Sequence, residues 1–162
     1  MREHFVGRSP RLTAYFCGIT LGLALLVAGV EAVRIGRVEL SGASYAAYLL
    51  AGAFGGVLLA FVAGYLNGSL LASWMAGVVP AAGVLGDPLA AGSLPTLPRA
   101  LATALAIGVL VGTAGFVLAV EKHRRDARRT DLPTPASRGD LLRLVAVSLL
   151  VSTALLVASG LL

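Results

Sequence analysis

The feature that most limits the fold of this chain is a run of 47 residues, 40–86, without a single charged side chain. As one helix the run would be about 70 Å long, at about 1.5 Å per residue. That length is more than twice the roughly 30 Å of a bilayer's hydrocarbon core. The run must therefore turn, and Asn67-Gly68 is the turn signal that it contains. We predict two membrane helices here, 45–66 and 69–86.

Three shorter uncharged runs complete the pattern, at 12–30, 100–120 and 144–162. Each is close to the ~20 apolar residues that one membrane-spanning helix requires. Because 57% of the chain is hydrophobic and only 13% is charged, a water-soluble domain and a disordered chain are both excluded. The predicted fold is an all-α polytopic membrane helix bundle, a single integral membrane domain over residues 1–162. Its five transmembrane helices are expected at about 12–32, 45–66, 69–86, 100–120 and 143–162.

Two alternatives to this arrangement stay open. In the first, the segment 69–85 is re-entrant or interfacial, and only four helices cross the membrane. In the second, the first run is a secretory signal peptide that is cleaved, because Val30-Glu31-Ala32 resembles a small-residue cleavage site. The 19-residue apolar core of this run exceeds the roughly 7–15 residues of a signal peptide, so we retain it as a membrane helix.

The distribution of basic residues predicts the orientation in the membrane. With five spans and a cytoplasmic N-terminus, ten of the 13 Lys and Arg residues lie inside and three, Arg34, Arg37 and Arg99, lie outside. With four spans the best division is nine against four. Since basic residues near helix ends stay on the cytoplasmic side, five spans are preferred. We therefore expect a cell-membrane protein with a cytoplasmic N-terminus, a basic cytosolic loop at 121–142 and a partly extended external loop at 83–98.

Small residues recur at every fourth position in four of the predicted helices. Positions four apart lie along one helix face, and a face without side chains lets two backbones approach closely. Whether the partner is a neighbouring helix or a second copy of the chain stays open. The runs are Ala14, Gly18 and Gly22; Gly52, Gly56, Ala60, Gly64 and Gly68; Ser69, Ser73, Gly77 and Ala81; and Ala100, Ala104, Gly108 and Gly112. The predicted helix-packing residues are Gly52, Gly56, Ala60, Gly64, Gly68, Gly77, Gly108 and Gly112.

The segment 55–69, with the sequence GGVLLAFVAGYLNGS, resembles a signature of small archaeal membrane proteins, haloarchaeal ones above all. Those proteins belong to uncharacterised families, described as domains of unknown function, and carry glycine-zipper helix hairpins. The resemblance covers about residues 45–82, and its second half, from Ser73 to Gly77, matches in part. It implies a location in the membrane and no known activity.

No residue of the chain is predicted to carry out catalysis or to hold a metal or cofactor. All eight acidic residues lie at span ends or in loops, and so do His4 and His123. Hydroxyl side chains within the spans have no base at the same depth, which a nucleophile would need. Ser73 and Ser152 are expected instead to hydrogen-bond backbone carbonyls, and Cys17 to be a small buried hydrophobe. We therefore expect a protein that is not an enzyme and uses no cofactor.

The charged segment 121–143 holds seven basic and four acidic residues. In one interpretation its arginines attract anionic lipid headgroups, at up to about 1 kcal/mol per basic residue. In the other it shows only the ordinary bias of cytoplasmic loops toward positive charge. Nucleic acid is not an expected partner, because no aromatic or base-reading element accompanies the arginines. The candidate headgroup contacts are Arg124, Arg125, Arg128 and Arg129.

These observations leave two hypotheses for function. In the first, the chain is a non-enzymatic integral membrane protein that acts through helix packing, with a second copy or another membrane protein as its partner in the lipid bilayer. In the second, it is a small permease or channel subunit for an uncharged or small solute, with Gly56, Gly64 and Pro80 lining the path. Spans without charges favour the first hypothesis over ion-coupled transport.

Overall fold

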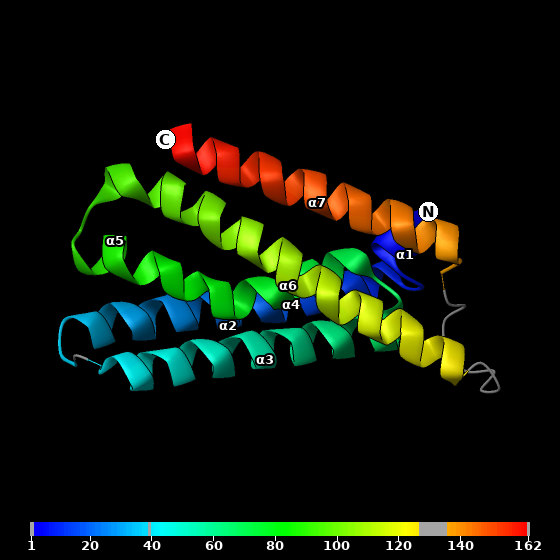
Figure 1. Ribbon diagram of the computed structural model, residues 1–162, viewed down its shortest axis with the longest axis horizontal. Helices are drawn as coiled ribbons and strands as arrows, with labels where there is room; N and C mark the ends of the chain where they lie inside the picture. The colour runs from blue at the N-terminus through cyan, green and yellow to red at the C-terminus, as the bar shows by residue number, and fades with distance from the viewer. Residues whose placement is uncertain (1, 39, 127–135, 162) are drawn as a thin grey trace.

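The computed structural model describes residues 2–38, 40–126 and 136–161 (Figure 1). In these ranges every regular element is a helix, which confirms the predicted all-α fold. Five segments are long and apolar enough to cross a membrane, so the chain is a membrane protein of the helix-bundle class. The segment that follows Asn67 is one of these five. It starts at the end of the bundle that holds the N-terminus and runs to the opposite end.

Most helices extend beyond the predicted spans, because an uncharged run marks only the apolar centre of a helix; the α-helix that follows Asn67 is shorter than predicted, Leu70–Ala81 against 69–86. The basic loop is shorter than the predicted 121–142, since one helix continues to Arg125 and the next begins at Arg138. The elements are α1 (Arg2–Val6), α2 (Pro10–Ile35), α3 (Gly42–Asn67), α4 (Leu70–Ala81), η1 (Ala82–Leu85), α5 (Gly86–Ala90), η2 (Leu94–Thr96), α6 (Leu97–Arg125) and α7 (Arg138–Leu161). The candidate spans are Pro10–Ile35, Gly42–Asn67, Leu70–Ala90, Leu94–Arg125 and Arg138–Leu161.

Helix α4 occupies the centre of the bundle. It packs against α2, α3 and α6, and α6 packs in turn against α3 and α7. Helix α7 rests mainly on α6, and in Figure 1 it runs along the outer side of the bundle. Helices α2 and α3 share only a small contact, although they follow one another in the chain. The two most deeply buried spans are therefore those of α4 and α6.

Local signals in the sequence explain where the long helices begin and end. Helices α2, α3 and α4 each follow a serine whose hydroxyl oxygen accepts a backbone N–H of the first turn: Ser9, Ser41 and Ser69. Helix α3 ends at Asn67 and is capped by Gly68, which has a left-handed φ of 65° that glycine adopts without strain. Gly68, one of the predicted helix-packing residues, is therefore the cap of this helix. Its N–H donates to the Gly64 carbonyl at 2.7 Å.

The stretch 83–98, expected to be a partly extended loop, folds instead into short helical turns, namely η1, α5 and η2. Gly86 and Pro88 within it are buried, so these turns cover one end of the bundle. Backbone groups next to an apolar environment lack water as a partner, and local bonds satisfy them. The Ser93 N–H, for example, donates to the Pro88 carbonyl at 2.9 Å.

Candidate functional site

The small residues predicted for helix packing form the contact between α4 and α6. Gly77 faces the backbone of α6: a Cβ added to it would strike the Gly108 carbonyl and lie 2.5 Å from the Gly112 nitrogen. A Cβ on Gly108 would lie 2.8 Å from the Val78 Cα, and one on Gly112 would lie 2.5 Å from the Trp74 Cα. Only hydrogen fits at these three positions, so the two helix backbones touch.

Helix α3 packs against the same pair of helices through its own small residues. A Cβ on Gly56 would lie 2.5 Å from the Pro80 Cγ, and one on Gly64 would lie 2.9 Å from the Ser73 Oγ. At Gly52 the distance to the Pro80 Cβ is an ordinary 3.6 Å. The partners of these glycines are neighbouring helices of the same chain. Gly56, Gly64 and Pro80, which the permease hypothesis places along a path, lie in this interface between helices.

Sequence reasoning missed one member of this interface, Gly115. A Cβ there would lie 2.5 Å from the Cβ of Ala60, which is fully buried as a packing residue should be, and 2.7 Å from the Phe61 nitrogen. Gly115 follows Gly112 by three positions and falls outside the four-residue period. Helix α6 therefore uses one face for α4 and an adjacent face for α3. A search at spacings of both three and four would have found it.

Polar side chains inside the bundle bind backbone carbonyls, as the sequence predicts. The Ser73 hydroxyl donates to the Ala60 carbonyl at 2.9 Å, which links α4 to α3. The Ser152 hydroxyl donates to the Ala106 carbonyl at 3.0 Å, which links α7 to α6. In the described part of the chain, every buried side-chain nitrogen or oxygen has a hydrogen-bond partner. These interior groups are therefore already used within the fold.

The small residues of α2 are placed differently from those of α3, α4 and α6. Ala14, Gly18 and Gly22 are exposed, and a Cβ added to Gly18, Gly22 or Gly29 would meet nothing within 4 Å. The opposite side of α2 carries its buried residues, which are Thr13, Thr20, Ala24, Ala28 and Glu31. The small-residue face of α2 (Ala14, Gly18, Gly22 and Gly29) therefore points away from the bundle.

At the end of the bundle that holds the N-terminus, the buried side chain of Asn67 joins α3 to the start of α2. Its Oδ1 accepts the Ser9 N–H at 2.9 Å, and its Nδ2 donates to the Ser9 carbonyl at 3.2 Å and to the Thr13 Oγ1 at 2.6 Å. Next to it, the Ser69 hydroxyl donates to the Phe5 carbonyl at 3.2 Å. The sequence shows Asn67 only as a turn residue, whereas the structure gives it a second role as a bridge between helices.

At the opposite end, the buried carboxylate of Glu31 in α2 is linked to α3 by a hydrogen bond from Tyr48. Glu31, only 6% exposed, accepts hydrogen bonds from the Arg34 Nε at 2.9 Å and from the Tyr48 hydroxyl at 3.0 Å. The Glu31 side chain also packs closely against Gly86 of α5. A buried carboxylate needs such partners, since an unpaired charge at this depth would be costly. The hydrogen bond from Tyr48 therefore joins the ends of α2 and α3, while the ion pair with Arg34 lies within α2.

The basic end of α6 is partly used within the chain. His123, expected in a charged loop, is a buried residue of α6 whose Nε2 donates to the Tyr65 carbonyl at 2.8 Å. Of the candidate headgroup contacts, Arg124 donates to the Ala136 carbonyl at 2.9 Å, while the Arg125 side chain is 75% exposed. Arg128 and Arg129 lie outside the described residues. No group of three His, Cys, Asp or Glu residues in the described ranges could hold a metal ion.

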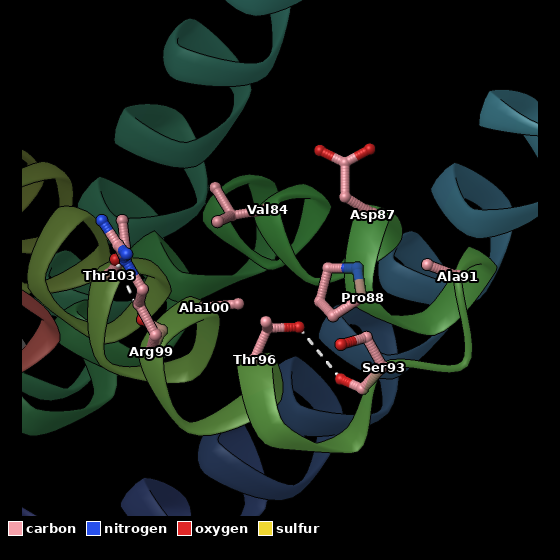
Figure 2. Close-up of a pocket in the computed structure, with 9 residues that line it drawn as sticks. All are labelled: Val84, Asp87, Pro88, Ala91, Ser93, Thr96, Arg99, Ala100 and Thr103. Atoms are coloured by element: carbon pink, nitrogen blue, oxygen red, sulfur yellow. Dashed lines mark hydrogen bonds between the residues drawn. The ribbon is translucent and has the colours of Figure 1, made fainter. Parts of the chain in front are cut away.

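A hollow of about 510 Å³ opens beside α5, η2 and the first turns of α6 (Figure 2). Two hydroxyl groups at its edge bond locally: Thr96 donates to the Ser93 carbonyl and Thr103 donates to the Arg99 carbonyl, both at 3.0 Å. Asp87 stands on one side of the hollow. The lining residues are Val84, Asp87, Pro88, Ala91, Ser93, Thr96, Arg99, Ala100 and Thr103. This hollow was not predicted from the sequence, because 83–98 was expected to be a partly extended loop.

Comparison with known proteins adds no relative to this description. No family model, no curated protein and no solved structure matches the chain.

Proposed function

We propose that this chain is a non-enzymatic protein of the cell membrane, with a cytoplasmic N-terminus, that acts by assembling with a second copy of itself. The observation that carries this proposal is the exposed small-residue face of α2. In α3, α4 and α6 the small-residue runs are buried against other helices, and only in α2 does such a run lie open.

Within the single chain, no close contact requires glycine at these exposed positions. Glycine in a helix costs about 1 kcal/mol relative to alanine, and a Cβ on Gly18 or Gly22 would meet nothing. In lipid, apolar side chains gain little from contact with each other, whereas small residues let two backbones pack closely. Two copies that present the same face form a closed pair with two-fold symmetry. Close packing of two α2 helices would therefore account for the retained glycines.

The paired state of the buried ionisable groups supports a role without catalysis. Glu31 and His123 are both buried, and each is bonded to a structural partner that links two helices. A catalytic acid or base needs to reach a reacting group in a substrate. These two side chains are directed instead at Arg34 and Tyr48 in one case, and at the Tyr65 carbonyl in the other.

Cysteine cross-linking in membranes tests the assembly proposal. In a Cys17→Ser background, Gly18→Cys and Gly22→Cys should form disulfide-linked dimers under mild oxidation. The control is Leu23→Cys, which is also exposed but lies about 100° or more around the helix from both glycines. The expected yield at Leu23 is several-fold lower. Equal yields at the three positions would indicate random collisions and would refute the proposed interface.

A further inference from the structure

The hollow beside α5, η2 and α6 has the size and the position of a ligand site. Its volume of about 510 Å³ falls within the roughly 300–1,000 Å³ of small-molecule sites. Buried Pro88 and Ala100 contribute to its apolar wall together with Val84 and Ala91. The hollow does not involve the small-residue face of α2.

Two opposite charges border the hollow. Figure 2 shows Asp87 and Arg99 on different sides of it, with Pro88 and Thr96 between them. Both side chains are exposed, and within the described residues neither forms an ion pair. A ligand that carries both a cationic and an anionic group would match these two charges at once. A ligand with a single charge would leave one of them unmatched.

The two charges also lie at the depth of lipid headgroups. Asp87 directly follows the uncharged run 40–86, and Arg99 directly precedes the run 100–120, so both mark the edge of the hydrocarbon region. From the hollow, an exposed apolar strip continues along α6 through Ile107 and Leu110, which are 37% and 41% exposed. These residues follow Thr103 at spacings of four and three and so lie on the same helix face. The surface therefore offers a charged pocket with an apolar extension.

We propose that the hollow binds the headgroup of a zwitterionic phospholipid that carries a primary ammonium. The Arg99 guanidinium donates hydrogen bonds to the phosphate oxygens, a geometry for which arginine is well suited. The Asp87 carboxylate accepts from the ammonium group. One acyl chain lies on the strip formed by Thr103, Ile107 and Leu110.

Native mass spectrometry of the purified protein tests this site with two lipids. Phosphatidylethanolamine carries both charges, and phosphatidylglycerol carries the same phosphate without the ammonium. The wild-type protein should retain phosphatidylethanolamine in preference to phosphatidylglycerol. Arg99→Gln should weaken the binding of both lipids. Asp87→Asn should remove only the preference for phosphatidylethanolamine. Each effect should be about two- to fivefold, as expected of an exposed ion pair. The control is Arg37→Gln, which removes an exposed arginine outside the hollow. This variant should change neither the binding of the two lipids nor the preference for phosphatidylethanolamine.

Three results would overturn the proposal. The first is equal retention of the two lipids by the wild-type protein, and the second is unchanged lipid binding by Arg99→Gln. The third is binding of glycerophosphoethanolamine, which has no acyl chains, as tightly as the intact lipid. That outcome would make the hollow a site for a soluble zwitterion. Because both variants change exposed side chains, their unfolding midpoints should equal that of the wild type.

Discussion

The variant Gly77→Ala adds one methyl group to the close contact between α4 and α6, and its effect on stability can be predicted in magnitude. Alanine favours a helix over glycine by about 1 kcal/mol in soluble hosts. Overpacking acts in the opposite direction and costs about 1–3 kcal/mol. The atoms that the new Cβ would meet, the Gly108 carbonyl and the Gly112 nitrogen, belong to the backbone and cannot rotate away. We therefore expect the top of that range and a net loss of about 2 kcal/mol in unfolding free energy.

Gly55 supplies a matched control, because a Cβ added there meets nothing within 4 Å. Gly55→Ala should be neutral or more stable by up to about 1 kcal/mol, since only helix propensity changes. Unfolding in mixed detergent micelles can be followed by the fluorescence of Trp74, the only tryptophan of the chain. The Trp74 Nε1 donates to the Thr113 Oγ1 across the α4–α6 contact at 3.0 Å, so its emission reports on this interface. A Gly77→Ala variant as stable as Gly55→Ala would refute the close contact.

Two further predictions concern topology and the polar bridge at Asn67. In a cysteine-free background, Glu3→Cys and Ser93→Cys should react with a membrane-impermeant reagent from opposite sides of the membrane; labelling from one side would restore the four-span alternative. Asn67→Ala should lower the unfolding free energy by about 2–4 kcal/mol, because the three hydrogen bonds of a buried side chain are lost. Ser44→Ala, at an exposed hydroxyl, should cost under about 0.5 kcal/mol in the same detergent assay, and similar losses for both variants would contradict a bridging role.

The sequence was sufficient to predict the helices, because the solvent imposes a simple rule on them. A helix in hydrocarbon satisfies its backbone hydrogen bonds internally and excludes charges, so the four charge-free runs, one of them divided at Asn67-Gly68, locate the five helices. The turn at Asn67-Gly68 was predicted because the run 40–86 is too long for one crossing and this dipeptide is its turn signal. The ends of the helices were harder to predict from the sequence. Charged residues such as those of 121–125 continue a helix outside the apolar region, and no charge pattern marks where it stops.

The packing partners could not be predicted from spacing alone. A four-residue period identifies a face of small residues but does not say what the face meets. Gly18 and Gly77 have the same spacing signal, yet one is open and the other touches a neighbouring backbone. The hydrogen bond between Glu31 and Tyr48 could not be predicted either, since it depends on how two helices are rotated about their axes. Such rotation depends on all the contacts of the bundle together.

The central position of α4 has a consequence for how the chain becomes stable in a bilayer. Its span is the least apolar of the five, and more than half of the residues in it are buried by other helices. The transfer of this span into lipid is therefore the least favourable of the five. Contacts with other helices must supply most of the remaining stability of α4. During insertion α4 precedes α6, so its backbone face at Gly77 lacks its partner until the later helix arrives. The stability of the third span thus depends in part on residues that are synthesised after it, those of α6.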